Sequence, residues 1–289
     1  MSKVLVTGGL GFIGSNLVDI LVEQGHEVTI IDNLSSISSK LSYSNKNATY
    51  VLGDIKDIKT LLENLSFDTI FHLAAEARIQ PSFDNPNHWF KSNSSGTMDV
   101  LEYARQNNIK SFVYATTSSK NHQEGHLLTP YTFSKVVGED ACRLYANIYK
   151  MNIGIATFYN VYGPREPEEG EFATVVAKFN RQYTNNEQLT IVGTGNQTRD
   201  FTHVYDICMG LIKISEGEWK AENFDLGKGE PISILDVAKS YVGNMLSRIS
   251  YIPLRKNEGM HTKSNWKQTE KKLHWRATHN LLEYITKNK

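Results

Sequence analysis

The stretch Thr7-Gly8-Gly9-Leu10-Gly11-Phe12-Ile13-Gly14 constrains this chain more than any other. It joins a short β-branched run at residues 3–6 to a segment with apolar residues at helical spacing over 12–22, so the glycines occupy a strand-to-helix turn. Residues without a Cβ make that turn tight, let the backbone approach a pyrophosphate and let helix and strand pack closely. Because the first helical N–H groups face the phosphates, the turn predicts a dinucleotide site.

An acidic residue follows the next predicted strand. Residues 27–31 read as that strand, and Asp32 comes close to the spacing at which a carboxylate receives the adenosine ribose hydroxyls. A carboxylate there would repel a 2′-phosphate, so we expect NAD rather than NADP. The alternative interpretation of Asp32 is a turn residue beside Asn33.

Strands and helices alternate through the first half of the chain. Strands are predicted at 49–52, 68–73 and 111–115, and helices at 59–65, 88–106 and 131–149. This order indicates an α/β fold with a doubly wound parallel sheet, the Rossmann architecture. Asp54 is expected either to accept a hydrogen bond from the adenine amino group or to cap a helix. The small residues Ala74 and Ala75 would let the cofactor lie against the backbone.

The composition excludes several partners and environments. Lys+Arg and Asp+Glu number 31 each, so no overall basic field attracts nucleic acid or an anionic membrane. Cys142 and Cys208 form no Cys-x-x-Cys pair, and no apolar run is long enough to span a bilayer. The sequence opens on a strand without a secretory signal pattern. We therefore expect a soluble cytoplasmic protein that binds neither nucleic acid nor membrane.

The candidate catalytic group follows the fifth predicted strand. Thr117 lies in the Thr116–Ser119 stretch directly after that strand, and Tyr131 and Lys135 lie four residues apart at the start of a helix, so their side chains share one face. Ionising a free Tyr near pH 7 costs roughly 4 kcal/mol, which Lys135 and a positively charged nicotinamide could together offset. Thr117 could hydrogen-bond the same substrate oxygen. The alternative is a chance Tyr-x-x-x-Lys spacing.

Five motifs in this order resemble the extended short-chain dehydrogenase/reductase family. They are Thr7 through Gly14, His72-Leu73-Ala74-Ala75, Tyr131-x-x-x-Lys135, residues 160–165 (Asn-Val-Tyr-Gly-Pro-Arg) and residues 193–201, which contain Arg199. The nearest group is the NAD-dependent nucleotide-sugar epimerases of the UDP-glucose 4-epimerase type. The resemblance runs from Lys3 to about Trp275, nearly the whole chain.

The resemblance implies a set of site residues. Tyr131 would be the acid/base, Lys135 its modulator and the nicotinamide-ribose anchor, and Thr117 the hydroxyl partner. Asn160, Arg199 and Arg255 would grip the nucleotide diphosphate, and Glu258 would hold the substrate ribose. The residues expected to contact NAD are Gly8, Gly11, Phe12, Ile13, Gly14, Asp32, Asn33, Asp54, Ile55, Leu73, Ala74, Ala75, Asn93, Tyr131, Lys135 and Tyr159.

The halves of the chain are expected to form two domains. Residues 1–165 would form the NAD-binding Rossmann domain, and 166–289 mainly a smaller α/β nucleotide-sugar domain. Residues 201–204 and 223–226 read as sheet-associated returns to the first domain within about 200–227. Residues 166–171 are a polar, acidic loop at the boundary. By resemblance, the two long helices, about 88–106 and 131–149, would pair two copies into a homodimer.

Several residues depart from the family pattern. Lys120-Asn121-His122 stands where the family has Val-Tyr-Gly, and Thr157 replaces a common arginine. These changes leave the wall of the sugar pocket open to question. His122-Gln123-Glu124-Gly125-His126 superficially resembles a metal motif, but its Glu is misplaced and Gly125 opposes a helix. We expect a solvated loop and no metal site.

The leading hypothesis is NAD-dependent epimerisation of a nucleotide sugar, at C4 of a UDP-hexose, through a 4-keto intermediate. The alternatives are a nucleotide-sugar 4,6-dehydratase or decarboxylase and a catalytically idle NAD-binding regulator. Dehydratases of the family follow the threonine with Asp-Glu, and decarboxylases usually carry Glu at position 119, whereas this chain has Ser118-Ser119. By resemblance, a small Thr262 predicts that N-acetylated sugars are tolerated as well as glucose.

Overall fold

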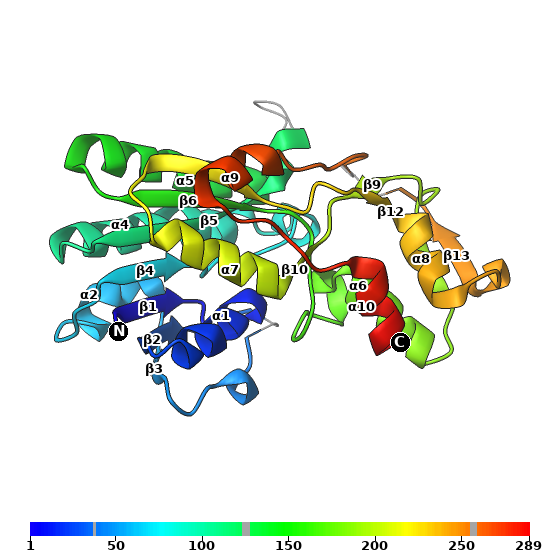
Figure 1. The fold of residues 1–289 in the computed structure, drawn as a ribbon, viewed down its shortest axis with the longest axis horizontal. Helices are drawn as coiled ribbons and strands as arrows, with labels where there is room; N and C mark the ends of the chain where they lie inside the picture. The colour runs from blue at the N-terminus through cyan, green and yellow to red at the C-terminus, as the bar shows by residue number, and fades with distance from the viewer. Residues whose placement is uncertain (37–38, 123–127, 255–258) are drawn as a thin grey trace.

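The computed structural model describes residues 1–36, 39–122, 128–254 and 259–289 (Figure 1). At its centre is a seven-stranded sheet in which every neighbouring pair is parallel. The strands of this sheet are β1 (Lys3–Thr7), β2 (Glu27–Asp32), β3 (Thr49–Leu52), β4 (Thr69–His72), β5 (Ser111–Thr117), β6 (Ile153–Phe158) and β11 (Lys220–Leu226). Their spatial order is β11-β6-β5-β4-β1-β2-β3, which confirms the predicted doubly wound fold.

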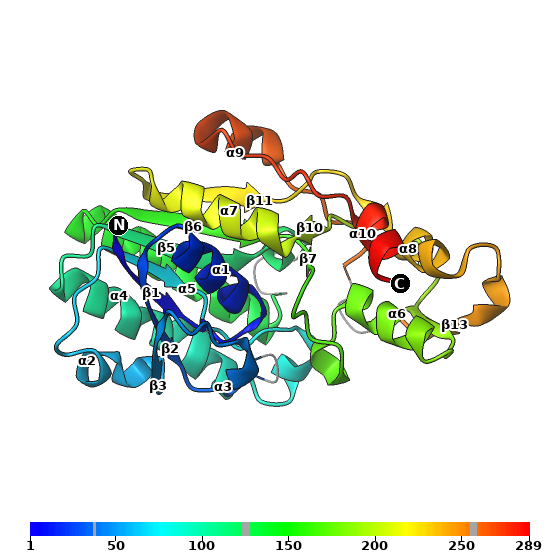
Figure 2. The same cartoon turned by 60° about the horizontal axis from the view of Figure 1, so that its bottom comes forward.

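Helices cover both faces of the sheet (Figure 2). On one face lie α1 (Phe12–Glu23) and α7 (Val204–Ser215), and on the other α2 (Ile58–Leu61), α4 (Gly96–Gln106) and α5 (Pro130–Tyr149). The central strands are buried on both sides and therefore consist largely of apolar residues. No helix in the described ranges combines the length and apolar character needed to cross a lipid bilayer.

The helix predicted over 88–106 is composite. It begins with α3 (Pro86–Trp89), continues through the π-helical turn η4 (Phe90–Ser95) and ends with α4. Asn85 caps its start, because its side chain accepts a hydrogen bond from the His88 N–H. Pro86 suits the first helical position, because an N–H at that position would have no acceptor within the helix. The π turn inserts an extra residue into the helix, a distortion often found at functional sites.

A smaller lobe with its own apolar core follows β6 (Figure 1). It contains α6 (Val175–Thr184), α8 (Ile234–Val242), α10 (Leu281–Asn288), the parallel pair β8 (Leu189–Val192) and β13 (Ile249–Ile252), and the antiparallel pair β9 (Thr198–Arg199) and β12 (Ile232–Ser233). α9 (Trp266–Leu273) instead packs on the large lobe against β11.

The two predicted returns to the large lobe have different outcomes. Residues 223–226 belong to β11, which pairs with β6 at the edge of the large sheet. Residues 201–204 do not join that sheet. Within them β10 (Thr202–His203) pairs with β7 (Val161–Tyr162) in a separate two-stranded ribbon, because both segments leave the large sheet to connect the lobes. The carboxyl ends of β1, β4 and β5 face this connection.

Candidate active site

A cavity of about 860 Å³ lies at the carboxyl ends of the central strands. The chain leaves β1 in one direction and β4 in the other, and the crevice at such a reversal is where open α/β sheets bind ligands. Both lobes contribute walls: Gly11, Leu73 and Tyr131 come from the large lobe, and Thr174 and Arg199 from the segments that follow β6. One pocket therefore extends from the glycine turn of the large lobe to the segments that follow β6.

The glycine turn forms one end of the cavity. Gly8 has φ +72°, and a Cβ there would lie 2.8 Å from the Ala74 backbone. A Cβ at Gly14 would lie 2.1 Å from the Gly8 carbonyl oxygen, so this position brings helix and strand together. Gly11 differs, since among the described residues its Cβ would meet only the Gly8 oxygen at 3.3 Å and Ser39 Oγ at 3.7 Å. Its open side faces the cavity.

The start of α1 fits a bound pyrophosphate. Gly11 is the N-cap, and no side chain of the described residues caps the helix, so the N–H groups of the first turn are available to an outside acceptor. Phe12, Ile13 and Gly14 all line the cavity. A dinucleotide phosphate placed at this turn would satisfy donors that the chain itself leaves open.

The predicted adenosine contacts lie together along the same wall. Asp32 is 5 % exposed, and its carboxylate accepts hydrogen bonds from Leu10 N at 3.0 Å and Leu34 N at 2.8 Å. Asp54 combines its two predicted environments, because it caps η2 (Ile55–Asp57) through Lys56 N and also lines the cavity. Asn33 Nδ2 donates to Asp54 Oδ2 at 3.0 Å. Ile55, Leu73, Ala74 and Ala75 also line this cavity.

A buried hydrogen-bond chain holds the wall after β4. Thr7 Oγ1 accepts from Ala74 N at 3.1 Å and lies 2.7 Å from His72 Nδ1, while His72 Nε2 lies 2.9 Å from Thr97 Oγ1. Thr97 Oγ1 donates to the Asn93 carbonyl at 2.7 Å. Each threonine hydroxyl has one proton to donate. Thr97 gives its proton to the Asn93 carbonyl and so accepts from His72 Nε2, while His72 Nδ1 accepts from Thr7. His72 is therefore neutral and carries its proton on Nε2.

The pKa of His72 agrees with that arrangement. Burial, and secondarily the charge of Lys135, lower it to about 3, so His72 is neutral across the physiological range.

Asn93 supports the site from behind the wall and is not among the residues that line the cavity. Its Oδ1 accepts from Glu76 N at 2.8 Å, and its Nδ2 donates to the Glu76 carbonyl and to Ser134 Oγ. Both amide protons are used within the protein, so the side chain does not have them free for the expected contact with NAD. Asn93 instead joins the loop after β4 to α5 through hydrogen bonds. The π turn aims this side chain at that loop.

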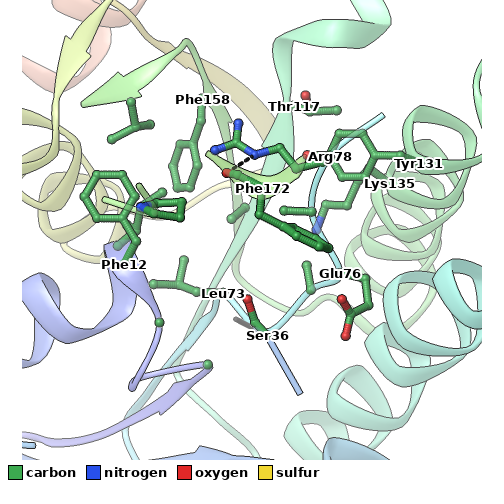
Figure 3. A pocket seen from close by; sticks show the side chains of 18 of the residues that line it. Phe12, Ser36, Leu73, Glu76, Arg78, Thr117, Tyr131, Lys135, Phe158 and Phe172 are labelled. Carbon is green, nitrogen blue, oxygen red and sulfur yellow. Dashed lines mark hydrogen bonds between the residues drawn. The ribbon is translucent and has the colours of Figure 1, made fainter. Parts of the chain in front are cut away.

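Thr117, Tyr131 and Lys135 meet at the middle of the cavity (Figure 3). Thr117 ends β5, which is parallel to β4, so its hydroxyl emerges at the same sheet edge as Leu73. Thr129 caps α5 and Pro130 occupies its first turn, which fixes the start of the helix one residue before Tyr131. Lys135 is one helical turn further on and 4 % exposed.

The pKa values of the catalytic pair differ from the sequence-based picture. Burial raises the pKa of Tyr131, while a hydrogen bond with Thr117 and the charge of Arg78 oppose that rise. Lys135 lines the cavity one helical turn after Tyr131. Its Nζ lies over the Tyr114 ring, 4.5 Å from the centroid, and burial lowers its own pKa to about 8. Arg78, which the sequence analysis did not identify, therefore contributes a positive charge that acts on Tyr131.

Lys120-Asn121 has a structural explanation. Lys120 Nζ donates to Glu139 Oε2 at 2.6 Å, and Thr116 Oγ1 donates to the same carboxylate at 3.2 Å. Asn121 Nδ2 donates to the Tyr159 hydroxyl at 2.8 Å. These residues tie the turn after Thr117 to α5 and β6. Residues 123–127, with most of the metal-like motif, lie outside the described residues.

Tyr159 lies behind the wall as well. Its hydroxyl donates to Asp225 Oδ2 at 2.9 Å, its side chain is fully buried, and it is not among the lining residues, whereas Phe158 and Asn160 are. Successive side chains along an extended backbone point to opposite sides. Phe158 therefore faces the cavity at the place where Tyr159 was expected to contact NAD. Alternation along the strand was the signal that would have found Phe158.

The predicted substrate contacts are placed in part. Asn160, with φ +25°, and Arg199 line the cavity, and Arg199 Nη1 donates to the Thr198 carbonyl at 3.0 Å. Arg199 lies on the short strand β9, not in the preceding glycine turn. Thr262 accepts from Asp200 N at 2.8 Å and also lines the cavity. Arg255 and Glu258 lie outside the described residues.

The chain resembles known proteins over almost its whole length. Residues 4–227 match the model of the NAD dependent epimerase/dehydratase family. A protein of Mycolicibacterium smegmatis named UDP-glucose 4-epimerase is 31 % identical over 257 residues, which cover 83 % of this chain and 82 % of that protein. A UDP-glucuronate 4-epimerase of Thermodesulfobacterium geofontis is 29 % identical and covers 95 % of this chain and 91 % of its own length.

Solved structures share the fold. The UDP-glucose 4-epimerase of Thermotoga maritima, solved with UDP-glucose, has a TM-score of 0.91 and 28 % identity, covering 99 % of this chain and 97 % of its own. The UDP-N-acetylglucosamine 4-epimerase of Methanobrevibacter ruminantium, solved with UDP-N-acetylmuramic acid, has a TM-score of 0.89 and 27 % identity, covering 99 % and 96 %.

Proposed function

The chain belongs to the NAD dependent epimerase/dehydratase family, and we propose that it is an isomerase that inverts C4 of a UDP-linked hexose. One observation carries this proposal. A single cavity joins the glycine turn to Tyr131 and Thr117 and then to Asn160 and Arg199. A dinucleotide and a nucleotide sugar placed in it end to end would meet at Tyr131.

The chain's own groups supply the proton chemistry. Tyr131 would accept the C4 hydroxyl proton, and Thr117 would hydrogen-bond the same oxygen as it becomes a carbonyl. Bound NAD would supply the acceptor, and then the donor, of the hydride. Because Arg199 would hold the substrate by its diphosphate, the 4-keto sugar could turn and present its other face before Tyr131 returns the proton. No net oxidation results.

The elimination chemistry of a dehydratase has less support. Removal of water across C5 and C6 needs an acid and a base near those carbons. Positions 118 and 119 are serines, and the Ser119 N–H and Oγ are both within hydrogen-bond distance of Thr117 Oγ1, at 3.2 and 3.1 Å. Their hydroxyls titrate far outside the neutral range and so cannot replace a carboxyl pair.

Proton NMR of the purified protein with NAD tests the proposal. We expect UDP-glucose to yield its C4 epimer, and the small Thr262 supports conversion of UDP-N-acetylglucosamine as well. Formation of a 4-keto-6-deoxy sugar or a pentose would identify a dehydratase or a decarboxylase instead. Bound NAD without turnover of any UDP-sugar would leave the idle regulator as the better explanation.

A homodimer forms part of the proposal. Exposed apolar side chains lie on α5 and the neighbouring α4: Phe133, Leu144 and Ile148 share one face of α5, Tyr149 ends that helix, and Met98 lies on α4, each between 42 and 58 % exposed. Such an apolar surface suits a four-helix contact between two copies. Light scattering should give twice the chain mass for the natural protein and one chain mass for Leu144→Glu/Ile148→Glu. A natural protein that is monomeric would contradict the dimer.

We further propose the division into a cofactor domain, residues 1–165, and a mainly substrate-binding domain, 166–289. The separate apolar cores support it, as does the return of α7 and β11 to the first. A cytoplasmic location is consistent with Cys142 and Cys208, which are both free and buried.

A further inference from the structure

Arg78 is placed in the cavity by unusual backbone. It follows the small residues at the end of β4 and has φ +85°, a left-handed conformation that a residue with a side chain rarely adopts. Residues held in such conformations cluster at functional sites.

The guanidinium spans the point where the lobes meet. Its Nε donates to the Phe172 carbonyl at 3.0 Å, and Figure 3 shows the group between Phe158 and Phe172, beside the corner formed by Tyr131 and Thr117. With Nε bonded in this way, the edge formed by Nη1 and Nη2 remains for a planar partner. Arg78 lines the same cavity as Tyr131 and Asn160.

The charge of Arg78 has no close partner on the described side chains. No carboxylate of these lies within 4.0 Å of it. Glu166 is an acid whose charge acts on Arg78, but its carboxylate accepts a hydrogen bond from Thr174 Oγ1. Burial raises the pKa of Glu166 to about 7, so Glu166 carries only part of a charge at neutral pH. A partly buried guanidinium without a counterion favours an anion that arrives with a ligand.

We propose that Arg78 is the receptor for a carboxylate on the sugar ring, and that the preferred substrate is a nucleotide-linked hexuronate. This inference rests on the proposed C4 epimerisation. The carboxylate of a hexuronate is attached to C5, next to the carbon that reacts at Tyr131. A guanidinium beside Tyr131 is therefore one substituent away from the reacting oxygen. Its free edge matches a carboxylate through two parallel hydrogen bonds.

The diphosphates of the substrate and of NAD are the other anions expected in the cavity. They would bind at positions different from that of a carboxylate on the sugar. Arg199 lies on β9 of the small lobe and is proposed to hold the substrate diphosphate, and the open first turn of α1 fits that of NAD. Arg78 leaves the loop after β4 and reaches the corner formed by Tyr131 and Thr117 (Figure 3). The anion it meets there belongs to the sugar.

Competing steady-state assays test the proposal. Purified protein with NAD is given UDP-glucuronate and UDP-glucose, and the 4-epimers are followed by proton NMR. We expect kcat/KM for UDP-glucuronate to exceed that for UDP-glucose at least tenfold. In Arg78→Met this ratio should fall about 100-fold, mainly through the KM of the uronate, and Arg78→Lys should lose about tenfold because it keeps charge without the planar fork.

Matched controls separate the possible failures. Arg105→Met removes an equal charge from the surface of α4 and should leave the ratio unchanged. An unaltered ratio in Arg78→Met, or a wild-type preference for UDP-glucose, would overturn the carboxylate role while leaving C4 epimerisation intact. Loss of NAD from Arg78→Met, measured by ultrafiltration, would overturn it by assigning Arg78 to the cofactor. Absence of any 4-epimer would instead remove the proposed function.

Discussion

Lys120 Nζ lies 2.6 Å from Glu139 Oε2, and this pair joins the turn that carries Thr117 to the helix that carries Tyr131. Glu139 is 3 % exposed on its side chain and also accepts from Thr116, Arg143 and Asn223. The pair thus occupies the place where the sequence departs from its family, and it fixes two catalytic elements relative to each other.

Lys120→Met should destabilise the protein and impair catalysis together. Glu139 loses its ion pair with Lys120 but retains the one with Arg143. We therefore expect a loss of about 1–3 kcal/mol in the free energy of unfolding, measured by urea titration. The double variant Lys120→Met/Glu139→Gln should recover part of that loss, because no buried charge remains. Equal losses in the single and double variants would show that the ion pair is not what joins these elements.

The same pair predicts a dependence of stability on pH. The ion pairs with Lys120 and Arg143 outweigh burial and hold the pKa of Glu139 below its usual value. The folded state therefore binds this proton less readily than the unfolded chain. Its contribution is fully present above about pH 4.5, the ordinary Glu value, and is lost as pH falls through the lowered pKa. Urea titrations from pH 6 to pH 3 should show a shallower decline in Glu139→Gln.

His72 predicts a second pH effect with its own window. Its folded pKa of about 3 lies below the ordinary value of 6.5, so the unfolded state takes up the proton first. Stability should fall by up to about 1.4 kcal/mol per pH unit as pH drops from 6.5 toward 3. His72→Gln can still accept from Thr7 and donate to Thr97 but does not titrate. A slope in this variant equal to that of the natural protein would exclude His72 as its source.

Alanine at Gly11 and at Gly14 should have different consequences. Gly14→Ala places a Cβ 2.1 Å from the Gly8 oxygen and should lower soluble yield and melting temperature. Gly11→Ala has room to fold, but its methyl group enters the pyrophosphate site, so NAD affinity should fall at least tenfold, or about 1.4 kcal/mol. Calorimetric titration with NAD and thermal melts distinguish the two. Normal NAD binding by Gly11→Ala would place the pyrophosphate elsewhere.

Tyr131→Phe should lower kcat for C4 epimerisation by about 10²–10⁴-fold, the range for loss of a general acid/base, while NAD stays bound. Phenylalanine keeps the ring and removes only the hydroxyl that Thr117 bonds. Turnover by NMR and bound NAD by absorbance are measured on one preparation. Turnover within threefold of the natural protein would remove Tyr131 from the proton transfer.

The sequence by itself determined the features that depend on neighbouring residues. The glycine turn, the strand-helix alternation and the start of α5 follow from backbone freedom, apolar periodicity and capping, all of which act within a few residues. Thr117, Tyr131 and Lys135 were predicted from their position after the fifth strand, from the four-residue helical spacing and from the family resemblance, and all three line the cavity. Asn160 and Arg199 were found through family resemblance and do line the cavity.

Only the tertiary structure decided what depends on segments far apart in the chain. Asn93 lies behind the cavity wall because Glu76 and Ser134, from other segments, satisfy its polar groups. Arg78 acts on Tyr131, 53 positions later, and bonds to Phe172, 94 positions away. Burial and nearby charges set the pKa values of Lys135 and Tyr131, and neither is encoded in local spacing. The type of chemistry was therefore readable from motifs, whereas the groups that tune it emerged from packing.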